Sequence, residues 1–295
     1  MNEKFETLLQ QELLKLVFIF ISNRLKALFM KKICFSLALL ASGCVATKNV
    51  QVQKSADTFT ANGKLYASFF QQSAAEYQAL CWQAFNTARM RLDMILQETH
   101  SKPLAIVTDI DETLIDNSPY AVQQSLKGQD YEQPSWEQWT AKADGDTLAG
   151  AKTFLDYASS KGVKIFYLTN RKESERAGTL ANIQKYHFPD ATNEHLILKT
   201  AESSKEGRRQ KISETYEIAL LLGDNLADFS SVFDKKSIET RNSNVSQQAA
   251  EFGKRFIILP NTSYGDWESA AYHYQYNTTP AEKEAIIKRI LKKAN

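Results

Sequence analysis

Two carboxylates stand two residues apart in the segment IVTDIDET, at Asp109 and Asp111. In an extended backbone, residues i and i+2 point their side chains the same way. Carboxylates held that close repel each other unless one is protonated or a cation lies between them. The pair can therefore supply a metal-bound nucleophile beside a carboxylic acid that donates a proton. The alternative for this segment by itself is an ordinary turn rich in Asp and Thr.

Three other segments carry polar groups of complementary chemistry. They are the carboxylates of Asp224 and Asp228 in LGDNLAD, the hydroxyl of Thr169, the amide of Asn170 and the ammonium group of Lys205. Hydrogen-bond donors of this kind suit a phosphoryl group, and carboxylates suit a hard cation. Because the carboxylates alone would repel phosphate, the set implies Mg²⁺ on electrostatic grounds.

Short apolar runs precede these polar groups and are typical of buried parallel strands. Stretches with helical periodicity lie between the runs. This alternation predicts an α/β fold, a parallel sheet with helices on both faces, whose ligands bind beyond the carboxyl ends of the strands. The expected strands are 104–108, 163–168, 218–222 and 255–259, with 195–198 as a candidate fifth, and the expected helices are 151–161, 173–186 and 205–215.

A long amphipathic helical region is expected from Gly63 to about Glu98. Cys81 lies on its apolar face, so we expect a packing role for this thiol rather than a reactive one. The other members of that face are Tyr66, Phe69, Phe70, Tyr77, Leu80, Ala84, Phe85 and Ala88.

Residues 1–43 have the pattern of a leader. Met30 and two lysines precede an apolar run, as in a secretory signal, and the run ends in Ala-Ser-Gly-Cys44. That ending resembles a bacterial lipobox, in which the cysteine is lipidated and becomes the mature N-terminus, although Ala41 stands where Leu is usual. The alternative is an uncleaved membrane anchor, but an apolar run of about ten residues is short for a span. Met30 is placed to be the true initiator, unless 13–22 is an extra hydrophobic segment.

The net charge of +2 is concentrated in this leader. Residues 1–43 hold six basic and three acidic residues, which leaves 30 basic against 31 acidic residues in the remainder. That balance does not indicate a nucleic-acid polymer as partner.

Two long motifs carry a family resemblance, Ile106–Tyr120 (IVTDIDETLIDNSPY) and Leu222–Phe229 (LGDNLADF). They resemble the haloacid-dehalogenase-like superfamily and, within it, the class C acid phosphatases, which are lipoproteins of the bacterial outer membrane. The resemblance extends across most of 60–270, with one small departure at Ala219, where the family favours Ile or Val. It implies a haloacid-dehalogenase-like α/β core with a smaller, mainly helical flanking domain.

The resemblance also implies catalytic roles. Asp109 attacks phosphorus and forms an aspartyl-phosphate, and Asp111 protonates the leaving alkoxide and later takes a proton from water. The groups that hold the phosphoryl oxygens are Thr169, Asn170 and Lys205. Lys199, six residues before Lys205, is a rival for the ammonium group, and a solvated surface lysine is the ordinary interpretation of either.

By the same resemblance, Mg²⁺ is ligated by Asp109, by the backbone carbonyl of Asp111 and by Asp224, and Asp228 completes or orients the site. Trp136 and Tyr264 match positions where relatives stack a nucleobase between two aromatic rings. Ordinary packing is the alternative for both rings.

These features predict a Mg²⁺-dependent acid phosphatase that hydrolyses phosphomonoesters. The expected substrates are nucleoside 5′-monophosphates, including nicotinamide mononucleotide, taken for nutrient scavenging. The expected location is the outer membrane, through a lipid on Cys44, and a homodimer is expected by analogy. The alternatives are a phosphotransferase of the same superfamily and a surface ligand-binding lipoprotein.

We expect five segments along the chain. They are a leader at 1–43, a lipidated tether at 44–61, an N-terminal helical region at 62–101, an α/β core at 102–260 with a cap insertion at about 117–150, and a C-terminal helical region at 261–295 packing on the flanking domain.

Overall fold

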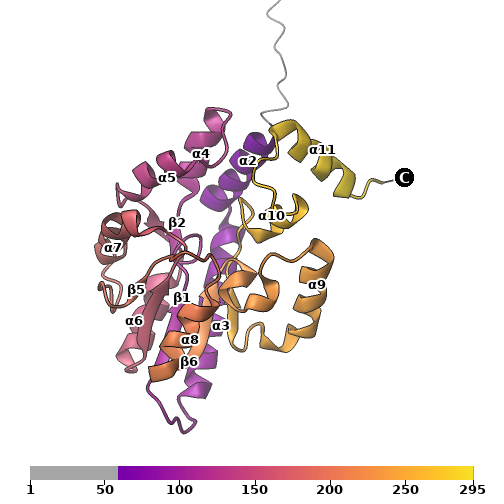
Figure 1. The fold of residues 1–295 in the computed structure, drawn as a ribbon. Helices are drawn as coiled ribbons and strands as arrows, with labels where there is room; N and C mark the ends of the chain where they lie inside the picture. Colours follow the sequence, from indigo (N-terminus) through magenta and orange to yellow (C-terminus); the bar gives the residue numbers. More distant parts are fainter. Residues whose placement is uncertain (1–58, 295) are drawn as a thin grey trace, which may run out of the picture. The chain divides into compact units, whose positions relative to one another are not determined.

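A five-stranded parallel sheet lies at the centre of residues 59–294, the part of the chain that the computed structural model describes (Figure 1). Its strand order is β5-β4-β1-β6-β7. The strands are β1 (Leu104–Thr108), β4 (Lys164–Leu168), β5 (Leu196–Ile197), β6 (Glu217–Gly223) and β7 (Phe256–Ile258). All four neighbouring pairs are parallel. The predicted α/β fold is therefore confirmed, including the candidate fifth strand.

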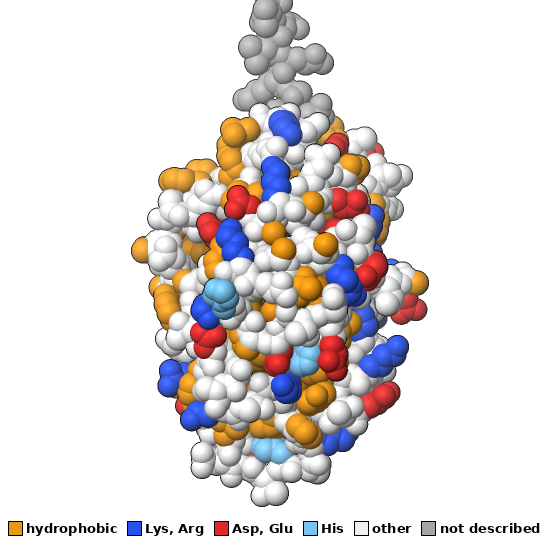
Figure 2. Space-filling model, turned by 90° about the vertical axis from the view of Figure 1, so that its left-hand side faces the viewer, with side chains coloured by type: hydrophobic (Ala, Val, Ile, Leu, Met, Phe, Trp, Pro, Cys, Tyr) orange, Lys and Arg blue, Asp and Glu red, His pale blue; other side chains and the backbone are white. Residues whose placement is uncertain are grey.

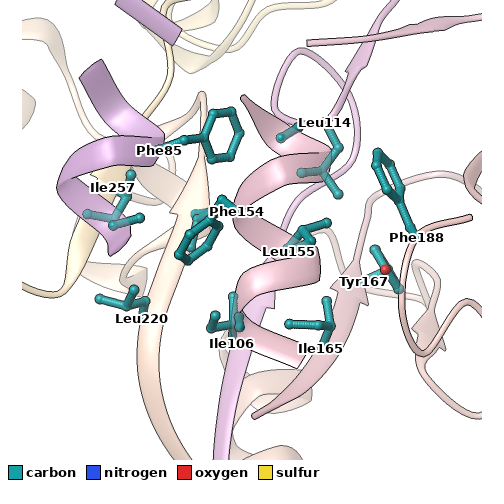
Figure 3. Close-up of a cluster of buried hydrophobic side chains, with 14 of the residues drawn as sticks. Phe85, Ile106, Leu114, Phe154, Leu155, Ile165, Tyr167, Phe188, Leu220 and Ile257 are labelled. Atoms are coloured by element: carbon teal, nitrogen blue, oxygen red, sulfur yellow. The ribbon is translucent and has the colours of Figure 1, made fainter. Parts of the chain in front are cut away.

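Alternate residues of the strands enter two separate hydrophobic clusters, one on each face of the sheet. Ile106 and Ile165 lie in the first cluster, together with residues of α3 (Ala75–Ile95) and α6 (Ala151–Ser160). Figure 3 shows this cluster, with Phe154 and Leu155 of α6 above the strands. Val107 lies in the second cluster with Ile212 of α8 (Glu206–Thr215). Burial on both faces explains why the strands are continuous apolar runs.

The remaining elements are helical, apart from a short antiparallel pair of strands, β2 (Ile115–Asp116) and β3 (Asp146–Thr147). The further α-helices are α2 (Phe59–Ser73), α4 (Ser118–Leu126), α5 (Gln133–Thr140), α7 (Arg176–Lys185), α9 (Ile238–Gln247), α10 (Asp266–Ala271) and α11 (Pro280–Ile290). Helices α2, α4 and α11 lie together, since α2 contacts both of the others. Among residues 59–294, no helix has the length and apolar content that crossing a membrane requires.

The helical region before the sheet differs from the prediction in two ways. It is two helices that meet at Ala74, and α2 begins at Phe59, inside the segment expected to be tether. The expected apolar face is also wrong for α2, where Tyr66 and Phe69 are 74% and 61% exposed. The reason is that α2 turns polar residues inward, with Gln71 donating to the Asp116 carboxylate at 2.7 Å.

Helix α3, by contrast, buries its expected face. Tyr77, Phe85 and Ala88 are buried there, although Leu80 remains 44% exposed. Cys81 is completely buried and free, which agrees with a packing role. The leader, most of the expected tether and Cys44 lie outside the described residues.

Candidate active site

Three neighbouring strands end at the same edge of the sheet, and each delivers an expected site residue there. Asp109 follows β1, Thr169 follows β4 and Asp224 follows β6. The Asp109 backbone NH donates to the Leu222 carbonyl at 2.9 Å, so the first turn after β1 is tied to β6. Gly223 is required beside it, because a Cβ there would lie 2.3 Å from a carboxylate oxygen of Asp228.

Lys205 stands between two buried carboxylates. Its Nζ lies 2.5 Å from Asp109 Oδ1 and 2.7 Å from Asp228 Oδ1. Burial works against the charge of Lys205, but the two carboxylates outweigh it and raise the pKa of the ammonium group. The side chain at 205 therefore reaches the expected phosphate site, whereas Lys199 lies half-buried in the segment after β5.

Burial is the largest influence on Asp109 itself. It raises the pKa of Asp109 to about 7, and the attraction of Lys205 only partly offsets it. The neighbouring charges of Asp228 and Asp111 act in the same direction as burial. Without a further cation, the Asp109 carboxyl therefore keeps its proton to a higher pH than an ordinary aspartate does.

Three carboxylates gather around this point. One oxygen each from Asp109, Asp224 and Asp228 lies within 4.8 Å of the others. Burial, followed by the charges of Asp228 and Asp109, raises the pKa of Asp224 well above its ordinary value. One ammonium group does not balance three carboxylates, and their oxygens are the ligands that a hard divalent cation takes. The donor set therefore fits a metal ion.

Asp111 does not join this group with its side chain. Its carboxylate accepts from Arg171, with Nη2 at 2.7 Å and Nε at 3.1 Å from Oδ1, and from Asn117 Nδ2 at 2.8 Å. Thr169 Oγ1 donates to the same carboxylate at the longer distance of 3.4 Å. The expected acid is therefore held beside the expected nucleophile, with a bidentate arginine behind it.

Arg171 was missed by the sequence reasoning. It is 3% exposed and its guanidinium also lies 5.6 Å from the centre of the Trp136 ring. The signal that was present is its position directly after Thr169 and Asn170, at the end of a strand that already carried two expected site residues.

Glu112 is a second residue that was missed. It is 1% exposed, has a positive φ of 51° and accepts from the Asn117 backbone NH at 2.9 Å. Burial, and after it the charge of Asp111, raises the pKa of Glu112 to about 8. The hydroxyl of Tyr264 donates to its other oxygen.

The two expected base-stacking rings have different surroundings. Trp136 is 8% exposed and packs edge-on against Tyr120, with ring centres 5.1 Å apart. Tyr264 is 36% exposed, in the segment after β7, and is tied to the catalytic loop through Glu112. Each ring therefore has a packing or hydrogen-bonding role besides any contact with substrate.

Asn170 is exposed next to buried Thr169. Its Oδ1 accepts from Arg208 Nη2 at 2.6 Å, and the Thr169 carbonyl accepts from Arg208 Nη1 at 2.7 Å. One edge of the sheet thus brings together the expected residues Asp109, Thr169, Asn170, Lys205, Asp224 and Asp228, while the Asp111 carboxylate faces Arg171.

Surface charge gives no sign of a polymeric nucleic-acid partner on the face seen in Figure 2. Acidic and basic side chains are interspersed there and form no continuous basic stripe.

Solved structures of similar proteins share this fold. The class C acid phosphatase from Bacillus anthracis with tungstate bound has 41% sequence identity and a TM-score of 0.78, over 81% of this chain and 100% of that chain. A second structure of the Bacillus anthracis enzyme matches at 41% identity and a TM-score of 0.78, over 80% of this chain and 99% of that one.

Curated relatives match over a shorter stretch. Acid phosphatase 1 from Solanum lycopersicum is 28% identical over 130 residues, 41% of this chain and 50% of the relative. A stem 28 kDa glycoprotein from Glycine max is 30% identical over 142 residues, 44% of this chain and 54% of the relative. The chain thus spans about half the length of the curated relatives it matches.

The model of one family covers most of the chain. Residues 30–267 match the HAD superfamily, subfamily IIIB (Acid phosphatase). This agrees with the fold, with the acidic site at the strand ends and with the resemblance that the two long motifs carried. The chain belongs to subfamily IIIB of the HAD superfamily, the acid phosphatases.

Proposed function

We propose that this chain is a Mg²⁺-dependent acid phosphatase that hydrolyses phosphomonoesters through an aspartyl-phosphate at Asp109. The observation that carries the proposal is the placement of Asp109, which is buried at a strand end, 2.5 Å from Lys205 and within the acidic group. The tungstate bound to the Bacillus anthracis relative supports it, because tungstate is a tetrahedral oxyanion like phosphate.

Four residues are candidates to hold the metal ion. Asp109, Asp224 and the backbone carbonyl of Asp111 would bind it, with Asp228 completing or orienting the site. When bound, Mg²⁺ would offset the carboxylate charge and withdraw charge from the phosphoryl oxygens.

Hydrolysis would then proceed by two successive displacements at phosphorus. In the first, an Asp109 oxygen bonds to phosphorus while the bond from phosphorus to the ester oxygen breaks, and Asp111 gives its proton to the leaving alkoxide. In the second, water attacks the same phosphorus, Asp111 takes the proton from the water, and the bond to Asp109 breaks. Lys205, Thr169 and Asn170 hold the phosphoryl oxygens during both steps.

The activity is tested by phosphate release across a panel of phosphomonoesters. Purified protein with Mg²⁺ is expected to release phosphate from nucleoside 5′-monophosphates, nicotinamide mononucleotide and a short alkyl phosphate, with the nucleotides having the lowest KM. A protein that binds these compounds but releases no phosphate from any of them would instead be a ligand-binding lipoprotein. Phosphate transfer to an added alcohol in preference to water would identify a phosphotransferase.

We further propose that Tyr264 and Trp136 hold the base of a nucleotide. Tyr264→Leu is expected to raise KM for nucleoside 5′-monophosphates about tenfold, since a stacked base is worth roughly 1–3 kcal/mol. KM for the alkyl phosphate should not change. Tyr264→Phe is the matched control, because it keeps the ring and removes only the hydroxyl that reaches Glu112. If Tyr264→Phe and Tyr264→Leu raise both KM values alike, the ring has no role in binding the base.

The location is also a proposal. We propose that Cys44 is lipidated and anchors the enzyme to the outer membrane, where hydrolysis would release nucleosides for uptake. Cells given labelled palmitate are expected to label the wild-type protein and not Cys44→Ala; equal labelling of both would refute the anchor. The expected homodimer likewise stays a prediction, which light scattering of the purified protein tests.

A further inference from the structure

Two buried arginines in the first turn of α8 have no part in the chemistry proposed above. Arg208 and Arg209 are 7% and 4% exposed, and they follow Lys205, the N-cap residue of the helix. Lys205 reaches into the site itself, between Asp109 and Asp228. The two arginines hold two different loops of that site.

Arg208 holds the loop after β4. Its Nη1 donates to the Thr169 carbonyl at 2.7 Å, and its Nη2 donates to Asn170 Oδ1 at 2.6 Å. A guanidinium has donors and no acceptor. The oxygen of the Asn170 amide must therefore face Arg208, which leaves the amide NH₂ to donate elsewhere. This is the orientation that a phosphoryl oxygen requires.

Arg209 holds the loop after β6. Its Nη1 donates to the carbonyls of Asp228 at 2.8 Å and Ala227 at 3.1 Å. Its Nη2 donates to Glu206 at 2.7 Å, and Glu206 in turn accepts from the Ser231 backbone NH at 3.2 Å. The backbone of Asp228 is thus fixed from α8, while its side chain bonds Lys205.

This arrangement has an electrostatic cost. Burial, with the adjacent charge of Arg209, lowers the pKa of Arg208, although Asp109 partly offsets that effect. Buried arginine charges are expensive, and here they contact mainly loop carbonyls. A site that needs its loops placed to within a fraction of an ångström gains from such contacts.

We propose that Arg208 and Arg209 are positioning residues with separate tasks. Arg208 positions the phosphate-binding loop, the segment after β4 that holds Thr169 and Asn170. Arg209 positions the metal-binding loop, the segment after β6 that holds Asp228. The inference rests on the function proposed above. The two arginines are neighbours on one helical turn and follow Lys205. Helix α8 therefore fixes the positions of Lys205, of the loop with Thr169 and Asn170, and of Asp228 relative to one another. The two tasks are separable, since the arginines share no loop contact.

Two calorimetric titrations test this separation. The probes are MgCl₂ added to metal-free protein, and inorganic phosphate added to protein saturated with Mg²⁺. Arg208→Met is expected to weaken phosphate binding about 10–100-fold and to leave Mg²⁺ binding unchanged. Arg209→Met is expected to weaken Mg²⁺ binding about 10–100-fold and to leave phosphate binding at saturating Mg²⁺ unchanged. Lys211→Met, an exposed position on the same helix, is the control and should change neither.

The conservative variants sharpen the result. Arg208→Lys and Arg209→Lys keep the charge and some of the donors, so each should recover part of the lost affinity for its own ligand and leave the other ligand unaffected. If either methionine variant fails to fold, the lysine pair is judged by the same criterion.

The assignment would be overturned if both methionine variants weakened Mg²⁺ binding and phosphate binding equally, or if they weakened neither. It would also be overturned if the wild-type protein bound neither Mg²⁺ nor phosphate. Phosphate release is measured separately. A wild-type protein that hydrolyses no phosphomonoester would refute the proposed function, while the titrations would still decide whether the two arginines have separate tasks.

Discussion

Replacing Asp109 with Asn is expected to lower phosphate release by about a thousandfold or more, the scale found when a covalent nucleophile is removed. The amide keeps the shape of the side chain and can accept from Lys205, which lies 2.5 Å from Asp109. It lacks the anionic oxygen that must bond to phosphorus. The loss should therefore appear in kcat, measured by single-turnover release from a nucleoside 5′-monophosphate.

The matched control is Asp156→Asn. Asp156 is an exposed carboxylate on α6 that pairs with Lys152 in the same helix, a contact worth little. This variant should retain full activity, and both variants should melt cooperatively. Activity of Asp109→Asn within tenfold of the wild-type protein would show that another group attacks phosphorus.

Removing divalent cations is expected to reduce phosphate release to background, and adding Mg²⁺ should restore it. Without a cation, the carboxylates of Asp109, Asp224 and Asp228 face a phosphoryl group, and the one ammonium group in contact with them, that of Lys205, does not balance three negative charges. The measurement is activity after dialysis against a chelator, followed by titration with Mg²⁺. Full activity in the chelated protein would contradict a metal-dependent reaction, and recovery with another divalent ion but not Mg²⁺ would correct the identity of the ion.

The metal-free protein should become less stable as the pH rises, because two of its carboxyls have a raised pKa in the folded state. The pKa of Asp109 rises on folding from its ordinary 3.8 to about 7, and that of Glu112 from 4.5 to about 8. Between those values the folded protein keeps protons that the unfolded chain has lost, so raising the pH favours unfolding. The metal-free Tm should be higher at pH 5 than at pH 8, and Mg²⁺ should narrow the difference. A metal-free Tm that rises from pH 5 to pH 8 would contradict the raised pKa values, because it would mean that the protein itself offsets the charge of these carboxylates.

The elements that position the site could be predicted from the sequence because their signals are local. The run 104–108 is apolar up to its last residue, Thr108, and is buried along its whole length, so its composition indicates a central parallel strand. Asp109, Thr169 and Asp224 follow directly from this, since parallel strands bring their carboxyl ends to one edge.

The buried arginines could not be predicted in the same way. Arg171 meets Asp111 across 60 residues of chain, and Arg208 meets Asn170 across 38. A guanidinium that binds a carboxylate or a loop carbonyl leaves no periodic pattern in the sequence around it. Such contacts depend on how far two loops stand apart, which only the folded chain determines.

The surface of α2 shows a different limit of sequence patterns. Apolar residues at helical spacing predicted a buried face, yet Tyr66 and Phe69 are exposed and Gln71 is buried. Spacing identifies the residues that share a face, but the hydrogen bond from Gln71 to Asp116 decides which face turns inward. The predicted helical region ran through Ala74 without a break. The structure has two helices there, α2 with mainly polar buried residues and α3 with mainly apolar ones.

The most direct test of the central claim is to trap the covalent intermediate. Enzyme in excess over a nucleoside 5′-monophosphate is quenched in acid within the first turnover and treated with borohydride, which reduces an aspartyl-phosphate to homoserine. We expect peptide mass spectrometry to find homoserine at position 109, and not in protein quenched without substrate. Homoserine at another carboxylate, or none at all while phosphate is released, would contradict attack by Asp109.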